Sequence, residues 1–466
     1  MMKFCITIVG AGLAGSEAAL VLSRFDNVKV KLIEMRPAVN TDVHKTDKCG
    51  ELVCSNSFKS LKQNSAAGML KYELAALASP LFKCAINSKV DAGNALAVDR
   101  IKFSNLVTEK ILQAENIEFV RDEFFDIDAE IKNCDALILA SGPLTSEKLC
   151  DSLKNITGSD HLSFYDAAAP IVMADSLDMS KIFVQDRYSK SEKCDYLNCP
   201  MEKDEYENFI NELLNAECVI KKNFESKDLF QACQPIEEVA KSGFDAPRYG
   251  ALKPTGLVDP KTDKRPYAVV QLRSENSEKN SYNLVGFQTN LTFSEQKRIF
   301  RMIPGLEKAE FARFGVMHKN TFINSPKLLN TNLSFKTCSK IFVAGQLSGT
   351  EGYMEAVRSG HHSALSLIFM LNKKDYIAPS KNTAFGALLD YATNADTINY
   401  QPMHVNFGLL PNLEKQIRNK QERYSQFAKR GKIEFDNYVK QLFENEIIGQ
   451  DVLRHSEKLV NKLEEL

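Results

Sequence analysis

The chain has 466 residues, of which 44% are hydrophobic and 26% are charged, and its formal net charge is −1. This length is sufficient for two or three domains with a large core. A net charge so close to zero excludes a global field that attracts nucleic acid, so a polyanionic partner would have to bind a local basic patch. No apolar run approaches the roughly 18 residues of a membrane span, and the apolar start leads into a glycine loop, which predicts a cytoplasmic protein without a membrane contact.

The cysteines predict neither cross-links nor a metal site. Eleven cysteines would indicate a disulfide framework in a small secreted chain, whereas here they are scattered over 466 residues and are expected to be reduced thiols. Cys49 and Cys54 are five positions apart, as are Cys194 and Cys199, and neither pair has the C-x-x-C spacing or the nearby histidines of common zinc sites. We therefore predict no metal.

The first elements expected along the chain are a strand, a helix and a second strand. Residues 4–10 are a short β-branched run, residues 11–24 are rich in Ala, Leu and Ser at helical spacing, and residues 28–34 alternate like a strand. Strands that alternate with helices predict a parallel sheet of the Rossmann type. Further strands and a late helix of this sheet are expected at 117–120, 135–142, 340–345 and 355–370.

The middle of the chain has a different texture. Its strand-like segments 267–272 and 282–286 are separated by turn-forming residues, which indicates a separate, inserted domain. We therefore predict an α/β fold in which a split Rossmann-like domain, a parallel sheet with helices, carries an inserted α+β domain. The expected divisions are 1–165 and 311–375 for the two parts of the Rossmann-like domain, 166–310 for the insertion, and 376–466 for a helical, charged C-terminal region.

A glycine-rich turn joins the first strand to the first helix. In a G-x-G-x-x-G motif the first glycine permits the tight turn, the second lets the main chain approach a pyrophosphate, and the third allows close packing of helix on strand. The helix N-terminus then faces the phosphates, and Glu34 at the end of the next strand is placed to bind ribose hydroxyls. This context predicts a dinucleotide site; the alternative is a glycine turn in an unrelated α/β protein. The residues of the motif are Gly10, Ala11, Gly12, Leu13, Ala14 and Gly15.

A late segment favours FAD over NAD as the resident dinucleotide. It runs from Val343 to Tyr353 after an expected strand, where the main-chain amides of the following helix start can face a flavin and its ribitol. The common motif has Gly-Asp where this chain has Gly345-Gln346, and a glutamine can still hydrogen-bond a ribitol hydroxyl without charge. Beyond the glycine turn, the expected FAD-binding residues are Glu34, Arg36, Gly142, Gly345, Gln346, Glu351, Gly352 and Tyr353.

Eight segments of the chain carry a resemblance to one known family. They are Ile8-Val-Gly-Ala-Gly-Leu-Ala-Gly-Ser-Glu-Ala-Ala19, Glu34-Met-Arg-Pro37, Glu51-Leu-Val-Cys-Ser-Asn-Ser-Phe58, Ala95-Leu-Ala-Val-Asp-Arg100, Tyr165-Asp-Ala-Ala-Ala-Pro-Ile-Val172, Asp195-Tyr-Leu-Asn-Cys-Pro-Met201, His318-Lys-Asn-Thr-Phe-Ile-Asn-Ser-Pro326 and Asn406-Phe-Gly-Leu-Leu-Pro411. They closely resemble the FAD- and methylenetetrahydrofolate-dependent tRNA uracil-C5 methyltransferases called TrmFO, which are shorter relatives of the tRNA-modifying protein MnmG. Two departures are Ala232-Cys-Gln-Pro235, where the family usually has Gly-Cys-Met-Pro, and Ser141-Gly-Pro143, where it has Thr-Gly-Pro.

The resemblance implies an enzyme that makes 5-methyluridine in the T-loop of tRNA. The one-carbon unit would come from 5,10-methylenetetrahydrofolate and be carried on reduced FAD, with NADPH or NADH as the reductant. A thiolate that adds to uracil C6 makes C5 nucleophilic, so such an enzyme needs an activated cysteine. Two cysteines match the family's reactive positions: Cys54, expected to lie over the flavin, and Cys233, expected to attack uracil, although the two roles could be exchanged.

The RNA would meet the protein at a local basic patch. Arg248 and Lys253 follow Cys233 in a loop that contains glycine and proline, and a second group of cations near the C-terminus is spaced so that several project from one side of a helix. The alternative for the second group is a solvated helix whose glutamates balance the charge. His318 either orients flavin or folate or makes a structural hydrogen bond. The C-terminal candidates are Lys415, Arg418, Lys420, Arg423, Lys429 and Arg430.

Other functions fit parts of the sequence. The nearest alternative is the same chemistry on ribosomal RNA, since one branch that resembles this family methylates ribosomal RNA. A plain NAD(P)H-dependent flavin oxidoreductase accounts for the dinucleotide site but not for the polar loop 53–57 that contains Cys54. An MnmG-like wobble-uridine modifying protein would have a longer C-terminal helical region. A flavin-binding RNA chaperone would tolerate the loss of Cys54 and Cys233. The sequence leaves open the RNA position, the choice between NADH and NADPH, and the oligomeric state.

Overall fold

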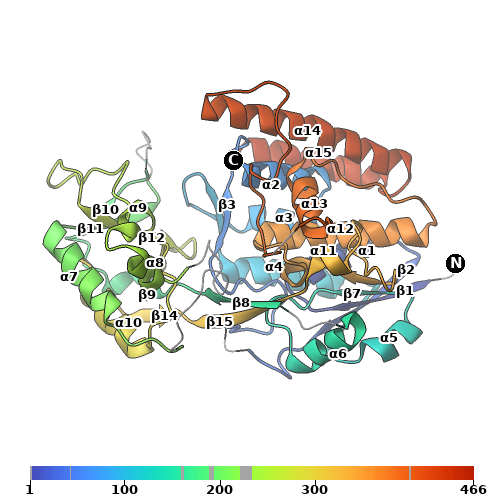
Figure 1. Ribbon diagram of the computed structural model, residues 1–466, viewed down its shortest axis with the longest axis horizontal. Helices are drawn as coiled ribbons and strands as arrows, with labels where there is room; N and C mark the ends of the chain where they lie inside the picture. The colour runs from blue at the N-terminus through green and yellow to red at the C-terminus, as the bar shows by residue number, and fades with distance from the viewer. Residues whose placement is uncertain (1–2, 42, 159–161, 188–193, 221–233, 398–399) are drawn as a thin grey trace.

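The protein folds into two lobes of unequal size that lie side by side (Figure 1). The structure, a computed structural model, describes residues 3–41, 43–158, 162–187, 194–220, 234–397 and 400–466. The larger lobe contains both the first and the last elements of the chain, and the smaller lobe is formed by the middle of the chain.

The larger lobe is built on a five-stranded parallel sheet with the strand order β16-β7-β1-β2-β6. β1 pairs in parallel with β2 on one side and with β7 on the other, so the first strand of the chain is central. The side chains of β7 are buried throughout, as expected for a parallel strand that is covered on both faces. The expected α/β fold with a split parallel sheet is therefore confirmed. The strands are β1 (Phe4–Val9), β2 (Val28–Glu34), β6 (Ile117–Arg121), β7 (Ala136–Leu139) and β16 (Ile341–Val343).

Helices cover both faces of this sheet. α1 (Leu13–Leu22) and α12 (Tyr353–Leu371) lie together on one face, and α5 (Ile127–Asn133) and α6 (Glu147–Thr157) lie on the other (Figure 1). α1 and α12 approach closely because Gly360 faces Ala14: a Cβ atom at Gly360 would lie only 2.1 Å from the Ala14 carbonyl oxygen. This contact packs the middle of α12 against the start of α1, next to the glycine turn.

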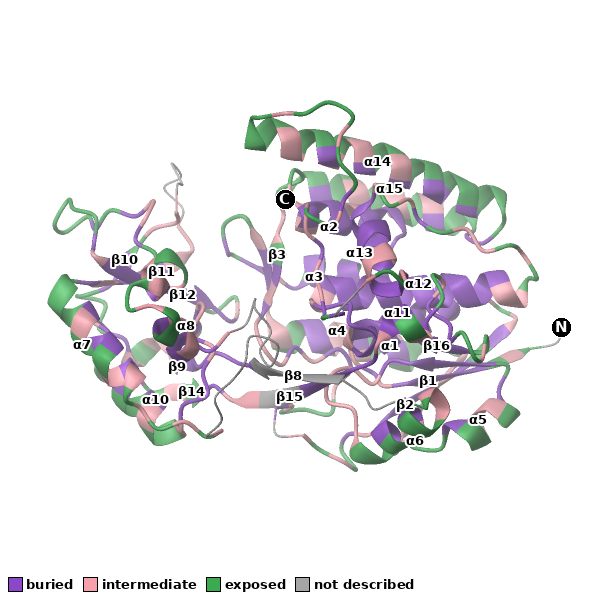
Figure 2. Ribbon diagram, in the orientation of Figure 1, coloured by how far each residue is buried: buried purple, intermediate pink, exposed green. Residues whose placement is uncertain are grey.

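A further helical layer and a small antiparallel sheet complete the larger lobe. Figure 2 shows that the inner faces of this layer are buried, whereas α14 exposes its outer face. None of the described helices is long and apolar enough to cross a membrane. The sheet consists of β3 (Ser57–Ser60), β4 (Lys89–Val90) and β5 (Ala95–Val98), and the helices are α2 (Ala66–Ala76), α3 (Pro80–Asn87), α4 (Arg100–Gln113), α11 (Ser325–Leu328), α13 (Ala384–Thr393), α14 (Lys420–Glu444) and α15 (Gln450–Glu464).

The start of α14 corrects one expectation about the basic C-terminal residues. The side chain of Asn419 accepts a hydrogen bond from the Glu422 N–H at 3.1 Å and so caps the helix, which begins at Lys420. Lys415 and Arg418 precede the helix, so the expected helix carries only four of the six cations: Lys420, Arg423, Lys429 and Arg430. The capping asparagine was the local signal that could have set this boundary.

The smaller lobe contains a six-stranded sheet with the order β10-β11-β12-β13-β9-β14, in which all neighbours are antiparallel. Helices pack on it, and β8 (Leu162–Ala167) and β15 (Met317–Phe322) form a two-stranded link to the larger lobe. We propose that the inserted domain begins at 166, and its sheet ends with β14, just past the expected boundary at 310. The elements are β9 (Ile171–Met173), β10 (Phe183–Val184), β11 (Tyr196–Met201), β12 (Ala268–Ser274), β13 (Ser281–Leu284), β14 (Phe311–Arg313), α7 (Lys203–Leu214), α8 (Ile236–Ser242), α9 (Ala246–Tyr249) and α10 (Phe293–Phe300).

Buried His362 in α12 is expected to make the stability of the fold depend on acid. Its Nε2 lies 3.1 Å from the Thr331 carbonyl oxygen, and burial, followed by the positive charge of Arg358, lowers the pKa of His362 to about 3. The folded state thus favours the neutral ring, so this stabilisation is complete above the unfolded pKa of about 6.5 and is lost as the pH falls toward 3. In the wild type, this effect should lower the free energy of unfolding by about 2 kcal/mol between pH 7 and pH 5. Replacing His362 with Gln, which can still donate a hydrogen bond to the Thr331 carbonyl oxygen, should abolish this loss.

Urea unfolding at the two pH values measures this effect. The exposed His455, replaced in the same way, serves as the control and should leave the pH dependence unchanged. An equal acid dependence in the wild type and in the His362→Gln variant would contradict the prediction.

Candidate active site

The turn between β1 and α1 presents open main chain to a cavity. Gly10 has a φ of +98°, and a Cβ atom at Gly15 would lie 1.8 Å from the Gly10 carbonyl oxygen, so both positions require glycine. Gly12 differs, because an added Cβ atom there would have no atom within 4 Å. Gly12 is also the N-cap of α1 and no side chain caps this helix, so its first N–H groups remain available to an anion.

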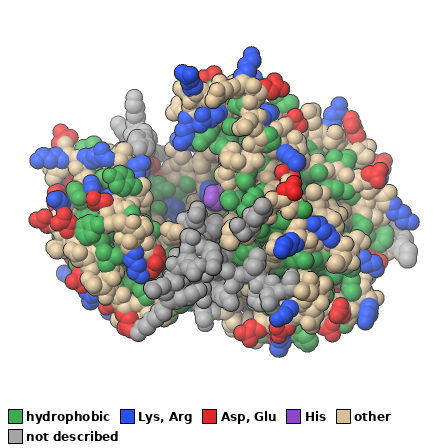
Figure 3. All heavy atoms as spheres, viewed as in Figure 1, with side chains coloured by type: hydrophobic (Ala, Val, Ile, Leu, Met, Phe, Trp, Pro, Cys, Tyr) green, Lys and Arg blue, Asp and Glu red, His purple; other side chains and the backbone are tan. Residues whose placement is uncertain are grey.

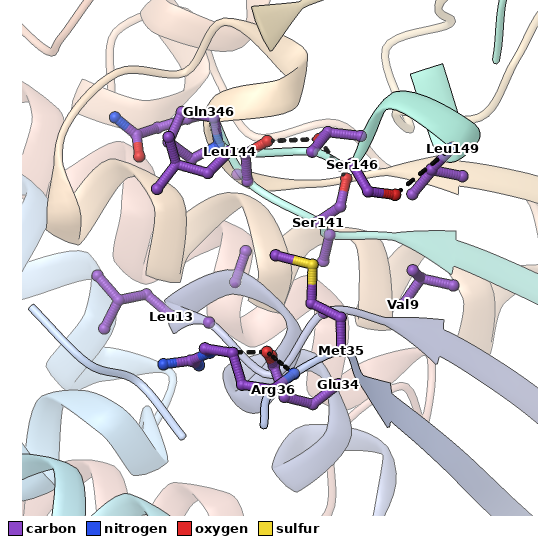
Figure 4. A pocket seen from close by; sticks show the side chains of 18 of the residues that line it. Val9, Leu13, Glu34, Met35, Arg36, Ser141, Leu144, Ser146, Leu149 and Gln346 are labelled. Carbon is purple, nitrogen blue, oxygen red and sulfur yellow. Dashed lines mark hydrogen bonds and ion pairs between the residues drawn. The ribbon is translucent and has the colours of Figure 1, made fainter. Parts of the chain in front are cut away.

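The cavity lies at the carboxyl edge of the parallel sheet (Figure 4). Figure 4 shows Glu34, Met35 and Arg36 on one side and Ser141 and Gln346 on the opposite side, so the walls come from segments far apart in the sequence. Met35 and Ser141 were not predicted. The predicted residues that line the cavity are Gly10, Gly12, Leu13, Ala14, Glu34, Arg36, Gly142, Gly345, Gln346 and Tyr353.

The four other residues predicted to bind the cofactor do not line the cavity but lie next to residues that do. Ala11 donates its N–H to Glu34 Oε2 at 2.8 Å, and Gly15 packs against Gly10 as described above. Glu351 accepts a hydrogen bond from the side-chain amide of Gln346. Gly352 is the N-cap of α12 and has a φ of +108°. Their positions explain why the motif includes residues that do not line the cavity.

Glu34 is held as a charged group in the cavity wall. Its Oε1 accepts a hydrogen bond from Arg36 Nε at 2.8 Å, and Arg36 Nη1 also contacts Glu51 at 2.9 Å. Burial opposes the ionisation of Glu34, but the ion pair with Arg36 and the amide of Ala11 outweigh it and keep the pKa of Glu34 below its ordinary value. A fixed carboxylate at the end of β2 can accept hydrogen bonds from ribose hydroxyls.

Cys54 lies in the loop between β2 and β3, which contacts the same wall through Tyr353. The Tyr353 Oη atom accepts the N–H groups of Cys54 at 2.8 Å and of Ser55 at 3.1 Å. The Cys54 Sγ atom lies 3.8 Å from the Ala167 carbonyl oxygen at the end of β8. Because Tyr353 also lines the cavity, the structure joins the two predicted features, the dinucleotide site and the cysteine loop, at one side chain.

Two arginines hold the Cys54 loop from its carbonyl side. Arg100, at the start of α4, donates to the carbonyl oxygens of Leu52 at 2.7 Å and of Cys54 at 3.2 Å. Arg313, at the end of β14, donates to the carbonyl oxygens of Val53 and Cys54, each at 3.0 Å. Sequence reasoning assigned no role to either arginine. Arg313 is 259 positions from Cys54, so no local pattern could have found it.

The second predicted cysteine, Cys233, lies outside the described residues. The next described helix, α8, has Glu237 and Glu238 in its first turn. Arg248 lies on α9 with its guanidinium 3.5 Å from the centre of the Tyr267 ring, and its Nε donates to the Tyr267 carbonyl oxygen at 3.1 Å, so it is engaged within its own lobe. Lys253 is exposed. His318 belongs to β15.

The basic C-terminal residues divide into two groups. Arg423 and Arg430 fasten the segment before α14, because Arg423 Nη1 donates to the Ile417 carbonyl oxygen at 3.2 Å and Arg430 Nη1 donates to that of Asn412 at 3.0 Å. The other cations are exposed, and Figure 3 shows Lys and Arg side chains gathered along the upper edge of the larger lobe, where α14 lies. The exposed group is Lys415, Arg418, Lys420 and Lys429.

The residues of the cavity fit a dinucleotide. The cradle at Gly12 is open, the N-terminus of α1 has no cap, and Glu34 is ionised at the opposite wall. Across the described residues, no group of three or more His, Cys, Asp or Glu side chains is arranged to hold a metal ion. The chemistry available in the described part of the site is therefore dinucleotide binding beside a thiol.

Comparison with known sequences identifies close relatives. A family model described as glucose inhibited division protein A matches residues 5–375. Proteins named methylenetetrahydrofolate–tRNA-(uracil-5-)-methyltransferase TrmFO are similar over nearly the whole chain. The one from Fusobacterium nucleatum is 48% identical over 435 residues, which is 93% of this chain and 99% of the relative. The one from Bacillus licheniformis is 47% identical over 429 residues, which is 92% of this chain and 97% of the relative.

Comparison with solved structures supports the fold described above. Two crystal forms of GidA from Aquifex aeolicus match with TM-scores of 0.68 and 0.69, each over 99% of this chain and at 16% sequence identity. The match covers 76% and 78% of the two GidA chains. At this identity the likeness concerns the arrangement of the elements.

Proposed function

Because this chain belongs to the TrmFO group of the glucose inhibited division protein A family, we propose that it is a folate-dependent tRNA (uracil-5-)-methyltransferase. The product is 5-methyluridine in the T-loop of tRNA, FAD is the resident cofactor, and 5,10-methylenetetrahydrofolate and NADPH or NADH are the co-substrates. Besides membership of the family, one structural observation supports the proposal: Tyr353 both lines the dinucleotide cavity and binds the Cys54 loop. A cytoplasmic location follows from the tRNA substrate.

The described residues of the cavity provide groups that suit each part of the cofactor. When bound, FAD supplies the electrons and the attachment point for the one-carbon unit. The open main chain at Gly12 and the N-terminus of α1 would bind the pyrophosphate, and Glu34 would bind the ribose. Arg36 acts indirectly, because its ion pair fixes the Glu34 carboxylate. Gln346, itself held by Glu351, is placed to bind the ribitol.

In this proposal, two cysteine thiols take part in separate steps of the reaction. Cys54, next to the cavity, handles the one-carbon unit at the flavin, and Cys233 adds to C6 of the target uracil, which makes C5 nucleophilic. The support for Cys54 is its loop, which is fixed by Tyr353 on one side and two arginines on the other. The support for Cys233 is its match to the family motif.

The exposed cations before and on α14 are the proposed contacts to RNA phosphates. Lys429 of this group also lines a groove between α2, α14 and α15, together with Lys62 and Lys432. Cations on one face can bind the phosphate backbone even though the net charge of the chain is −1. We propose Lys415, Arg418, Lys420 and Lys429 as primary contacts. Arg248 and Arg423 remain weaker proposals, since both are engaged with their own lobes, and Lys253 remains a proposal on its exposure alone.

The proposal is tested by following the one-carbon unit into RNA. Purified protein is incubated with unmodified tRNA, isotope-labelled methylenetetrahydrofolate and NADPH, and nucleosides are analysed by mass spectrometry. Label is expected in 5-methyluridine, and the Cys233→Ala variant should reduce its formation by at least about 1,000-fold, because nucleophilic addition has no substitute at C6.

Other results of this assay separate the alternatives. Label in ribosomal RNA but not in tRNA would keep the chemistry and change the substrate. Oxidation of NADPH without label in any RNA would identify a flavin oxidoreductase and contradict the proposal. Full activity in Cys233→Ala would reject the role of that thiol.

A further inference from the structure

The Cys54 loop lies between two guanidinium groups, of which only that of Arg100 is paired with a described carboxylate. Arg100 forms a two-point ion pair with Glu275, in which Nη2 lies 3.2 Å from Oε1 and Nε contacts Oε2. Arg313 makes no ion pair with any carboxylate of the described side chains, and its Nη1 and Nη2 atoms donate to main-chain carbonyl oxygens. The described groups therefore leave one positive charge in excess beside Cys54.

An excess guanidinium charge in this position is costly. Burial and, second, the like charge of Arg100 lower the pKa of Arg313. The Arg313 Nε atom is buried and has no hydrogen-bond partner among the described residues. A cation that is desolvated in this way destabilises the fold unless an anion lies close by. The site therefore favours a negative charge at a neighbouring group.

Cys54 is the group that can supply this charge. Among the described residues, the titratable and charged groups that interact with it electrostatically, or pair with those that do, are Arg100 from α4, Arg313 from β14, Glu275 after β12 and Tyr353 from α12. Tyr353 is neutral, because burial raises its pKa, and Glu275 is already paired with Arg100. Among these groups the thiol has no fixed charge of its own and can lose a proton near neutral pH.

We propose that Arg313 is a positioning residue for Cys54, which holds the loop carbonyl from the smaller lobe and supplies the positive charge that favours the thiolate form of the side chain. Since the thiolate is the reactive form of cysteine, Arg313 keeps Cys54 ready for reaction. The inference rests on the proposed function for the use of this thiolate, whereas the charge state depends on neither RNA nor folate. Because Arg313 comes from the smaller lobe, the reactivity of Cys54 depends on the contact between the two lobes.

The pH dependence of Cys54 alkylation tests this role. FAD-loaded enzyme is treated briefly with iodoacetamide between pH 5.5 and pH 10, and the modification of the peptide that contains Cys54 is measured by mass spectrometry. An opposite charge close to an ionisable group shifts its titration by about one to three pH units, so the wild-type midpoint should lie at least about one unit below 8.5. The Arg313→Gln variant should move the midpoint up by at least about one unit, which makes alkylation about tenfold slower at pH 7.

Two further variants separate charge from structure. Arg313→Lys keeps the charge but loses the two-point contact, so its midpoint should stay within about 0.5 units of the wild type. Arg301 is the matched control, since it also lies in the smaller lobe and donates from Nε and Nη2 to one carbonyl oxygen, that of Ala309, at 3.1 and 2.8 Å. Arg301→Gln should leave the Cys54 midpoint unchanged.

Several results would overturn the proposal. These are a wild-type midpoint at or above about 8.5, an Arg313→Gln midpoint equal to that of the wild type, or an Arg313→Lys midpoint raised as far as that of Arg313→Gln. If Arg313→Gln does not fold, the wild type and Arg313→Lys still decide the question. Alkylation requires no RNA and no folate, so failure here leaves the methylation assay untouched, and failure of that assay leaves this one interpretable.

Discussion

Replacement of Gly12 by leucine is expected to give a folded protein that no longer binds FAD. An added Cβ atom at Gly12 meets no protein atom within 4 Å, so the fold has room for a side chain. That room is the open side of the glycine turn, where the first N–H groups of α1 face the cavity. A leucine side chain would keep a pyrophosphate away from these groups. Loss of two charge-assisted hydrogen bonds, each worth at least about 1.5 kcal/mol, predicts affinity for FAD at least about 100-fold weaker.

The absorbance of bound flavin and a titration with FAD measure this loss, and circular dichroism checks the fold. Gly243→Ala is the control, because its Cβ atom would make only an ordinary 3.8 Å contact with the Ala246 Cβ atom in the smaller lobe. A Gly12→Leu protein that retains FAD with wild-type affinity would reject the glycine turn as the pyrophosphate site. Loss of folding in Gly12→Leu would contradict the expectation that the fold has room for a side chain at this position.

The glycine turn and its sheet were predictable because their constraints are local. Gly10 and Gly15 are required by a backbone conformation and by a contact within six consecutive residues. The alternation of apolar strands with helices likewise reads directly from the chain. The order of the strands, with β16 beside β7, was not predicted, because β16 lies beyond the insertion and the local pattern does not show which strand it pairs with.

The surroundings of Cys54 were not predictable, since they depend on how the two lobes meet. Asn56 in the same loop donates to the Val98 carbonyl oxygen of the larger lobe and to the Ser274 carbonyl oxygen of the smaller lobe, at 3.1 and 3.0 Å. Such contacts join residues that are more than 200 positions apart, and no periodic pattern encodes them. The functional importance of Tyr353 was expected at the cofactor, and its contact with Cys54 became visible only in the fold.

Substitution of Cys54 by alanine is expected to abolish methyl transfer and leave FAD in place. The loop is fixed by its main chain, through N–H groups that bind Tyr353 and carbonyl oxygens that bind Arg100 and Arg313, so the loss of Sγ should not displace it. A thiolate that takes part in covalent chemistry has no substitute in alanine, and the rate of 5-methyluridine formation should fall at least about 1,000-fold. Nucleoside mass spectrometry measures the rate, and flavin absorbance measures the bound FAD.

The matched control is Cys150→Ala in α6, because Cys150 Sγ lies 3.8 Å from the Thr145 carbonyl oxygen, as Cys54 Sγ lies 3.8 Å from that of Ala167. A Cys54→Ala rate within about tenfold of the wild type would make Cys54 a structural residue.

The Cys54→Ala and Arg313→Gln variants should also differ in how their defects in 5-methyluridine formation depend on pH. A thiol without Arg313 still ionises in alkaline solution, so the Arg313→Gln defect should shrink above about pH 9, whereas the Cys54→Ala defect should persist at every pH. A constant Arg313→Gln defect across this range would mean that the arginine fixes the loop without favouring the thiolate.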